Sequence, residues 1–288
     1  MIPANFAYHS PSTVEEAVGL LARLGDEARA LAGGHSLIPM MKLRLSAPEA
    51  LVDLSRIAAL KGVREEGSEV VIGAMTTQHQ LLQDPILAQT LPLIPETSAV
   101  IADPQIRYRG TLGGNVANGD PGNDMPAVMM TLDATYTLAG PNGERAVKAR
   151  EFYQGAYFTA AEDGEILTAV RIPVPPAGAG FAYEKLKRKV GDYATAAAAV
   201  QLTMKAGAVE TIAIGLTNVS ETPLLAEDAM AILAGARLEP EVVDRAVAAA
   251  EAITNPASDG RGPAEYRTAM AGVMLRRALA RAAARAQA

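Results

Sequence analysis

Residues 32–36 read Ala-Gly-Gly-His-Ser, and residues 111–115 read Thr-Leu-Gly-Gly-Asn. Paired glycines let the backbone adopt positive φ, and they let a ligand approach main-chain N–H groups because no Cβ stands in the way. Consecutive N–H groups in such a turn form a concave anion-binding nest. Ser36, Thr111 and Asn115 add polar side chains to the two loops. The pattern predicts that the loops face one another across a diphosphate.

The expected strength of such a site indicates the size of its ligand. A helix end or nest contributes about 1–2 kcal/mol to anion binding, whereas micromolar affinity requires about 8 kcal/mol. Burial of large rings must supply the difference, so the diphosphate belongs to a bulky cofactor. The sequence contains neither G-x-G-x-x-G nor G-x-x-x-x-G-K-[ST], which excludes the usual dinucleotide fingerprint and the P-loop. The alternative that the glycine pairs are ordinary turns stays open at this point.

Composition is that of a globular chain with a buried core. The 288 residues suggest two domains, because a domain takes roughly 100–200 residues. Hydrophobic residues make up 49% and charged residues 20%, which argues against disorder. A net charge of −6 and the absence of Trp weigh against nucleic acid as a partner. No apolar run approaches the ~18 residues of a membrane helix, and residues 1–10 do not resemble a secretory signal.

The absence of cysteine restricts the chemistry further. Disulfides, thiolate nucleophiles, zinc ribbons and protein-ligated iron–sulfur clusters are excluded. The three histidines, at positions 9, 35 and 79, are too scattered to suggest a metal site. A redox role for this chain would therefore require an organic cofactor.

Local patterns predict a mixed α+β chain. Ser12 and Thr13 precede Glu15 and Glu16, so two overlapping capping boxes open a helix that Gly25 ends. Further helices are predicted at 76–83, 92–102, 226–234, 240–253 and from 263 onward. Strands are predicted at 28–31, 51–54, 70–74, 136–139, 145–147, 166–172, 194–205 and 210–218. Prolines and glycines at 173–180 mark a domain boundary, which gives a first domain at 1–176, with lobes of about 1–55 and 56–176, and a second at 177–288.

Five segments carry a resemblance to a known family. They are AGGHSLIPMMKLRL (32–45), IADPQIRYRG (101–110), TLGGNVANGDPGNDMPA (111–127), YEKLKRKVGDYATAAAAV (183–200) and ITNPASDGRGPAEYRT (253–268). Together they resemble the flavin-binding medium subunit of molybdenum hydroxylases over nearly the whole chain. Within this family the chain is most similar to the branch of aerobic carbon monoxide dehydrogenases. The lack of cysteine separates it from relatives whose flavin subunit carries an extra iron–sulfur cluster.

The resemblance implies a fold, a cofactor and partners. The first domain would be a FAD-binding domain of the vanillyl-alcohol-oxidase (PCMH) type in two lobes, followed by a C-terminal domain of a small antiparallel sheet packed on helices. FAD would be bound noncovalently. A large subunit with the molybdenum cofactor and a small subunit with [2Fe-2S] clusters would complete a dimer of heterotrimers. Electrons would pass from the clusters through FAD to a quinone-type acceptor. The expected place is the cytoplasm, at the inner membrane face if the acceptor is a quinone.

The resemblance also implies site residues. The cofactor contacts would come from the two glycine loops and from scattered positions, namely Ala32, Gly33, Gly34, His35, Ser36, Thr111, Leu112, Gly113, Gly114, Asn115, Asp124, Ile101, Leu167, Lys185, Lys187 and Tyr193. The loops would hold the diphosphate and ribityl region, and Asp124 would hydrogen-bond the cofactor. Lys185 or Lys187 would lie near the polar edge of the isoalloxazine, and Tyr193 would shield the ring. No residue of this chain would be catalytic in its own right, and no metal would bind.

Other interpretations stay open. The substrate of the complex could be xanthine, nicotinate or an aldehyde, the chain could be an assembly subunit with an empty flavin site, or it could be an independent flavin oxidase. Residues 185–189 could form a solvated strand edge, and Tyr193 could be ordinary packing. His35 and Ser36 are adjacent in sequence, which disfavours a nucleophile–base pair with Asp53. Asp120 and Asp124 could be solvated loop formers.

Overall fold

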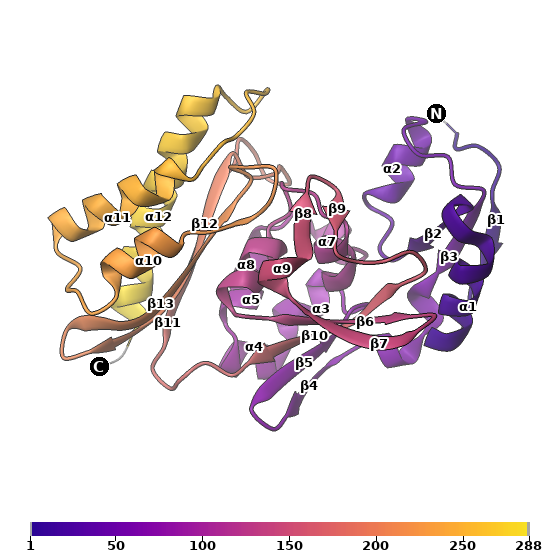
Figure 1. Cartoon of the computed structure of the whole chain (residues 1–288), viewed down its shortest axis with the longest axis horizontal. Helices are drawn as coiled ribbons and strands as arrows, with labels where there is room; N and C mark the ends of the chain where they lie inside the picture. The colour runs from indigo at the N-terminus through magenta and orange to yellow at the C-terminus, as the bar shows by residue number, and fades with distance from the viewer. Residues whose placement is uncertain (1, 287–288) are drawn as a thin grey trace.

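The computed structural model describes residues 2–286, and they form three larger sheets, arranged one after another along the long axis of the molecule, and one two-stranded sheet (Figure 1). The first sheet is parallel, with the order β1-β3-β2, and consists of β1 (Ala7–His9), β2 (Ala28–Leu31) and β3 (Ala50–Asp53). Helix α1 (Val14–Leu24) packs Ala17, Val18 and Leu21 against it. Helix α2 (Leu37–Lys42) follows the first glycine loop.

Helix α1 begins as the sequence predicts. The hydroxyl of Thr13 accepts from the N–H of Glu16 at 3.2 Å, and the carboxylate of Glu16 accepts from the N–H of Ser12 at 2.8 Å. Gly25 ends the helix with φ of 58°, a conformation that favours glycine. The Thr13 cap and the Gly25 stop are confirmed, whereas the two predicted capping boxes are not formed as such, because Glu16 accepts from Ser12 and the described residues show no bond between Ser12 and Glu15.

The second sheet is antiparallel and has five strands in the order β4-β5-β10-β6-β7. Its strands are β4 (Val63–Glu66), β5 (Glu69–Gly73), β6 (Thr135–Gly140), β7 (Gly143–Lys148) and β10 (Ile166–Pro173). Short helices and a small hairpin surround it: α3 (Gln78–Gln83), α4 (Pro85–Thr90), α5 (Leu93–Val100), α6 (Pro104–Arg107), α7 (Leu112–Ala117), α8 (Met125–Thr131), α9 (Ala149–Phe152), β8 (Tyr153–Gly155) and β9 (Phe158–Thr159). Single 3-10 turns lie at η1 (Gly25–Glu27), η2 (Leu54–Arg56) and η3 (Ala58–Leu60).

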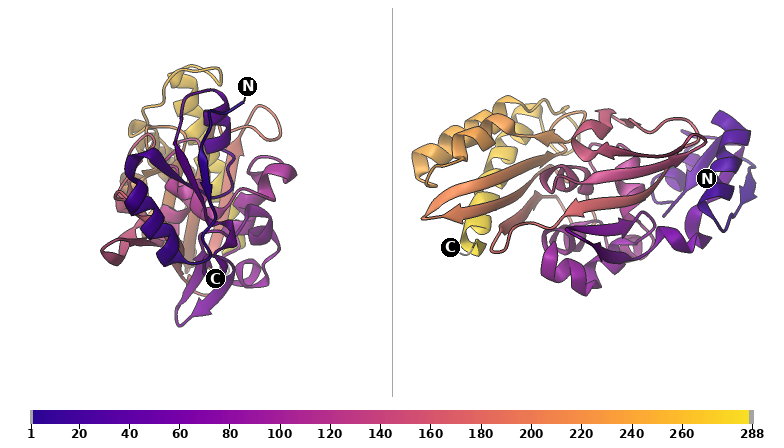
Figure 2. Two further views of the ribbon diagram at one scale, coloured as in Figure 1. Left: turned by 90° about the vertical axis from the view of Figure 1, so that its right-hand side faces the viewer. Right: turned by 60° about the horizontal axis from the view of Figure 1, so that its bottom comes forward.

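The third sheet is antiparallel in the order β11-β12-β13-β14. It contains β11 (Gly180–Leu186), β12 (Ala196–Lys205), β13 (Ala208–Thr217) and β14 (Leu224–Leu225). Its outer face carries α10 (Glu227–Leu233), α11 (Pro240–Ala252) and α12 (Ala264–Arg285), as both figures show (Figures 1 and 2).

The alanine-rich strand β12 has its two faces in different cores. Ala197 and Ala199 belong to the core shared with the five-stranded sheet, while Ala196 and Ala198 belong to the core under α10–α12. This is the period of two that a strand requires. Helix α8 lies between the second and third sheets, and Gly215 on β13 allows the backbone of Ala127 to approach closely. The predicted α+β class, with a C-terminal antiparallel sheet on helices, is confirmed.

Several elements were not predicted, among them β1, α2, β4 and α8, and strand β11 and helix α7 are two further cases. Strand β11 carries Glu184 and Lys185, so its pattern does not alternate apolar and polar residues. Helix α7 contains Gly113 and Gly114, which disfavour a helix by propensity. The hydroxyl of Thr111 caps α7 by accepting from the N–H of Gly114 at 3.0 Å. Tertiary packing therefore overrides local propensity at both places.

We expect Gly180→Ala to destabilise the chain by about 1–3 kcal/mol, because a Cβ there would collide with the carbonyl oxygen of Ala282 on α12. Gly19→Ala is the matched control, since Gly19 lies in α1 with open space around it. That exchange should stabilise by about 0.5–1 kcal/mol through helix propensity. Urea unfolding of both variants measures the difference, and equal stability would contradict the packing described.

Candidate functional site

A cavity of about 700 Å³ lies where the three sheets approach one another. The first glycine loop, helix α7 and the loop after β11 all contribute residues to its lining. This volume is within the range of roughly 300–1,000 Å³ that ligand sites occupy. Its lining includes most of the predicted site residues, namely Ala32, Gly33, Gly34, His35, Ser36, Ile101, Thr111, Gly113, Gly114, Asn115, Asp124, Leu167, Lys185 and Tyr193.

The two glycine loops are in contact. A Cβ at Gly33 would collide with the carbonyl oxygen of Arg109 and would lie 2.8 Å from Cα of Gly110. A Cβ at Gly114 would lie 3.2 Å from Cβ of Ala32. Only backbone without side chains can approach this closely, so the glycines are required for the loops to meet.

The two loops differ in the hydrogen bonds of their N–H groups. Within residues 2–286, the N–H groups of residues 33–36 have no protein acceptor. In the second loop, by contrast, the N–H of Leu112 donates to Thr76 O (2.9 Å) and that of Gly113 to Ala74 O (2.8 Å). The N–H of Gly114 is used by the Thr111 cap. The expectation that both loops offer consecutive free N–H groups is therefore wrong for the second loop, whose glycines serve close packing.

Two further amide side chains point to a polar ligand. Nε2 of Gln78 and Nδ2 of Asn118 are buried and have no hydrogen-bond partner among the described residues, and both residues line the cavity. Buried donors without partners are costly unless something accepts from them. Asn118 lies three positions after Asn115, a helical spacing that could have indicated it in the sequence. No spacing to a predicted site residue indicated Gln78 in the sequence.

A buried ion pair stands at the cavity wall between the second and third sheets. Nζ of Lys185 donates to Oδ2 of Asp124 at 2.8 Å, and the two side chains are 3% and 5% exposed. The hydroxyl of Tyr183 donates to Oδ1 of Asp124 at 2.5 Å. Burial and the Asp124 charge raise the pKa of Tyr183 well above its usual value, so its hydroxyl stays protonated. The carboxylate is thus held in one orientation.

The remaining predicted residues divide into two groups. Ile101 and Leu167 line the cavity as apolar walls, and Tyr193, 40% exposed, stands at its edge. Leu112 is fully buried in the core, and Nζ of Lys187 donates to Val100 O at 3.2 Å; neither side chain lines the cavity.

His35 does not bring a positive charge to the cavity at neutral pH. Desolvation and the nearby Arg109 cation lower the pKa of His35 below its ordinary value. Its imidazole is therefore neutral at pH 7. His35 would accordingly meet an anionic ligand at the first loop as a neutral group.

Comparison with known proteins assigns the chain to a family. Residues 4–175 match the FAD binding domain in molybdopterin dehydrogenase, and residues 181–282 match the CO dehydrogenase flavoprotein C-terminal domain. The chain belongs to the flavin-binding subunits of molybdenum hydroxylases.

Two carbon monoxide dehydrogenase medium chains align with this flavin subunit along essentially its whole length. It is 67% identical to the carbon monoxide dehydrogenase medium chain of Afipia carboxidovorans, with 100% of both chains covered. It is 52% identical to the medium chain from Hydrogenophaga pseudoflava, with 99% of each covered. It also matches a chain in the crystal structure of the cyanide-inactivated Cu,Mo-CO dehydrogenase with a TM-score of 0.98 and 67% identity, covering 99% of this chain and 100% of that one.

The residues of the cavity fit the flavin nucleotide that this family binds. The free N–H groups at 33–36 and the unpartnered amides of Gln78 and Asn118 suit phosphate and hydroxyl oxygens. Ile101 and Leu167 suit an apolar ring system. In residues 2–286 no group of three or more His, Cys, Asp or Glu side chains is placed to hold a metal ion. Within the same residues, no helix is both long and apolar enough to span a membrane.

We predict that Gly33→Ala releases FAD from the purified complex. The new Cβ would press on the backbone of Arg109 and Gly110 and would separate the two loops. Gly33 does not have positive φ, so the exchange introduces a steric collision without backbone strain. The ratio of flavin absorbance to protein measures the loss. Gly19→Ala serves as control, and full flavin content in Gly33→Ala would contradict the proposed contact.

We predict that Asp124→Asn costs about 3–5 kcal/mol of stability, because it leaves the buried Lys185 ammonium without a counter-charge. Tyr183→Phe should cost only about 1 kcal/mol, the usual value of one hydrogen bond. The double variant Asp124→Asn/Lys185→Met should recover much of the loss. Denaturant unfolding measures all of these variants, and strictly additive effects would show that the two charges do not interact.

Proposed function

We propose that this chain is the FAD-carrying electron-transfer subunit of an aerobic carbon monoxide dehydrogenase, in which CO and water become CO2. Identity of 67% and 52% over essentially the full length to two carbon monoxide dehydrogenase medium chains is the observation that carries the proposal. The cavity supports the proposal, because it is lined by hydrogen-bond donors without protein acceptors and by apolar side chains. An assembly subunit with an empty flavin site would not require either.

The proposed partners supply the redox centres that this chain does not contain. It has no cysteine and so cannot hold iron–sulfur clusters. In the proposed complex electrons reach it from another subunit, for which we propose a small iron–sulfur subunit beside a large molybdenum subunit in a dimer of heterotrimers. The acceptor is a quinone, and the complex works in the cytoplasm at the inner face of the membrane.

Each part of the cavity has a separate task in this proposal. The N–H groups of Gly33 to Ser36 bind the diphosphate, and the amides of Gln78 and Asn118 bind further oxygens of the nucleotide. Lys185, fixed by Asp124, places a positive charge at the wall. Bound FAD would supply a group that accepts electrons singly and delivers them in pairs. Ile101 and Leu167 exclude water from the buried side of the cavity.

The proposal is tested in a complex that contains the Gly33→Ala subunit. CO should still reduce the iron–sulfur clusters of this complex, because that step precedes the flavin. Electron transfer to a quinone should be lost together with FAD. Absorbance of the clusters and of a quinone analogue separates the two steps. Unchanged quinone reduction without flavin would reject the proposed route, and failure of CO to reduce any centre would reject CO as the substrate.

A further inference from the structure

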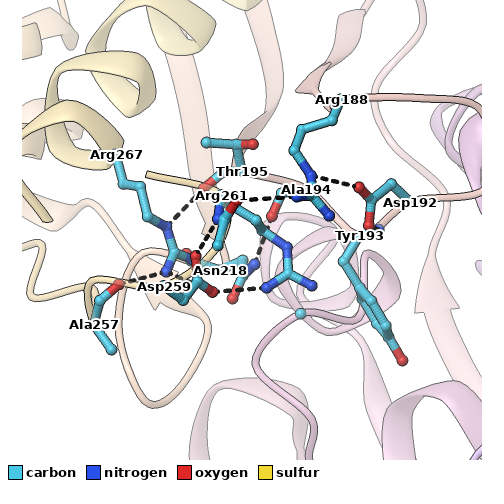
Figure 3. A network of polar contacts seen from close by, with 12 residues as sticks. Arg188, Asp192, Tyr193, Ala194, Thr195, Asn218, Ala257, Asp259, Arg261 and Arg267 are labelled. Carbon is cyan, nitrogen blue, oxygen red and sulfur yellow. Dashed lines mark hydrogen bonds and ion pairs between the residues drawn. The ribbon is translucent and has the colours of Figure 1, made fainter. Parts of the chain in front are cut away.

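The segment Ser258-Asp-Gly-Arg-Gly-Pro-Ala-Glu-Tyr-Arg267 lies outside the cavity, between α11 and α12 and in the first turn of α12. We call this segment, together with the preceding Ala257, the C-terminal motif (residues 257–267). Its polar groups converge on the loop of residues 187–195 that connects β11 to β12 (Figure 3). We call that segment the β11–β12 loop. It carries Gly191, Asp192 and Tyr193, which line the cavity.

Arg267 fixes the base of the β11–β12 loop. This arginine is 3% exposed, and its Nε donates to Thr195 O at 3.1 Å while its Nη1 donates to Ala257 O at 2.7 Å. Its Nη2 donates to Asn218 O, and Nδ2 of Asn218 in turn donates to Ala194 O at 2.5 Å. A buried guanidinium that donates to the backbone carbonyls of three separate segments fixes those segments relative to one another.

The tip of the same loop is tied to Gly260. Nη1 of Arg188 donates to Gly260 O at 3.0 Å, and its Nε donates to Oδ2 of Asp192 at 2.9 Å. The other oxygen of Asp192 accepts from the N–H of Tyr193 at 3.0 Å. The backbone on both sides of Tyr193 is therefore fixed by the C-terminal motif.

Arg261 acts on the ring of Tyr193 itself. Its guanidinium carbon lies 5.6 Å from the centre of the ring, a distance suited to a cation–π contact. Asp259 holds the guanidinium, since Oδ2 accepts from Nη1 of Arg261 at 2.7 Å and Oδ1 accepts from its N–H at 2.7 Å. The Tyr193 ring also packs on Gly122, where a Cβ would lie 2.8 Å from its Cδ1. The ring is thus confined between the loop that joins α7 to α8 and the C-terminal motif.

We propose that the C-terminal motif is a clasp that positions Tyr193 at the flavin cavity, with Arg261 as the positioning residue that sets the ring. This inference rests on the proposed binding of FAD in that cavity. Arg261 does not line the cavity and acts through Tyr193. A domain whose helices lie far from the glycine loops thereby contributes to the retention and environment of the cofactor (Figure 1).

The test is the release of FAD from the assembled complex. Arg261→Gln should increase the rate constant of release by about 5- to 10-fold, as expected for loss of a partly desolvated cation–π contact. Fluorescence of the freed FAD measures the rate. The visible circular dichroism of the bound flavin should change as well, because the neighbouring ring is no longer held. Arg261→Lys keeps the charge but not the planar fork, so it should restore only part of both signals.

Arg285→Gln is the matched control. Arg285 also stacks on an aromatic ring of the same domain, with its guanidinium carbon 4.6 Å from the centre of Phe181, and neither residue lines the cavity. The same exchange there should leave FAD release and the dichroism unchanged. Equal effects of the two exchanges would overturn the inference, because the loss would then be one of general stability.

A double variant tests whether Arg261 acts through Tyr193. In a Tyr193→Leu background, Arg261→Gln should add little to the rate of release. A full effect in that background would overturn the inference. If Arg261→Gln does not assemble, Arg261→Lys replaces it in the same comparison, with the same two outcomes. A wild-type complex that contains no FAD would instead reject the proposed function. If the wild-type complex holds FAD but Arg261→Gln leaves the rate of FAD release unchanged, only the clasp is rejected.

Discussion

The backbone of residue 33 touches the backbone of residues 109–110 with no side chain between them, and the arrangement of the cavity depends on this contact. The first loop belongs to a parallel sheet and the second to the surroundings of an antiparallel one, so nothing in either sheet alone brings them together. Gly113 adds a second close approach, to Ala74 at the end of β5. The isolated bridge between Thr77 and Thr111 closes the same junction. Side chains at these places would separate the lobes and open the site.

The glycine loops illustrate how far a sequence predicts such a site. Their pairing and the small polar residues beside them indicated a shared phosphate site, and the structure places both at one cavity. Sequence reasoning could not tell which loop keeps its N–H groups free, because that depends on the carbonyls of Ala74 and Thr76, about 40 residues away in the chain. Capped and periodic elements such as α1 were predictable for the opposite reason, since their determinants are local.

Strand β11 shows what local sequence patterns could not predict, although the family resemblance named Asp124 and Lys185 as site residues. A lysine and a glutamate in one short segment suggest a solvated edge, yet Lys185 is buried and pairs there with Asp124, whose other oxygen accepts from the hydroxyl of Tyr183. The partner of the lysine lies 61 positions away, and no local pattern encodes that distance. Gln78 and Asn118 were missed for a related reason, because an unpartnered amide is visible only when the groups around it are known.

The cavity needs all three sheets, and this has a thermodynamic consequence. The loop at 32–36 follows a strand of the first sheet, Ile101 and Thr111 lie at the ends of helices α5 and α7 beside the second, and Lys185 on β11 and Tyr193 in the loop after it come from the third. A ligand that binds only this assembled arrangement stabilises it by about 2.7 kcal/mol at a hundredfold excess over Kd. Burial of the Lys185–Asp124 pair opposes assembly through desolvation, and cofactor binding can offset that cost. Retention of the cofactor is therefore linked to those residues of the C-terminal domain that line the cavity, namely Lys185 and Tyr193.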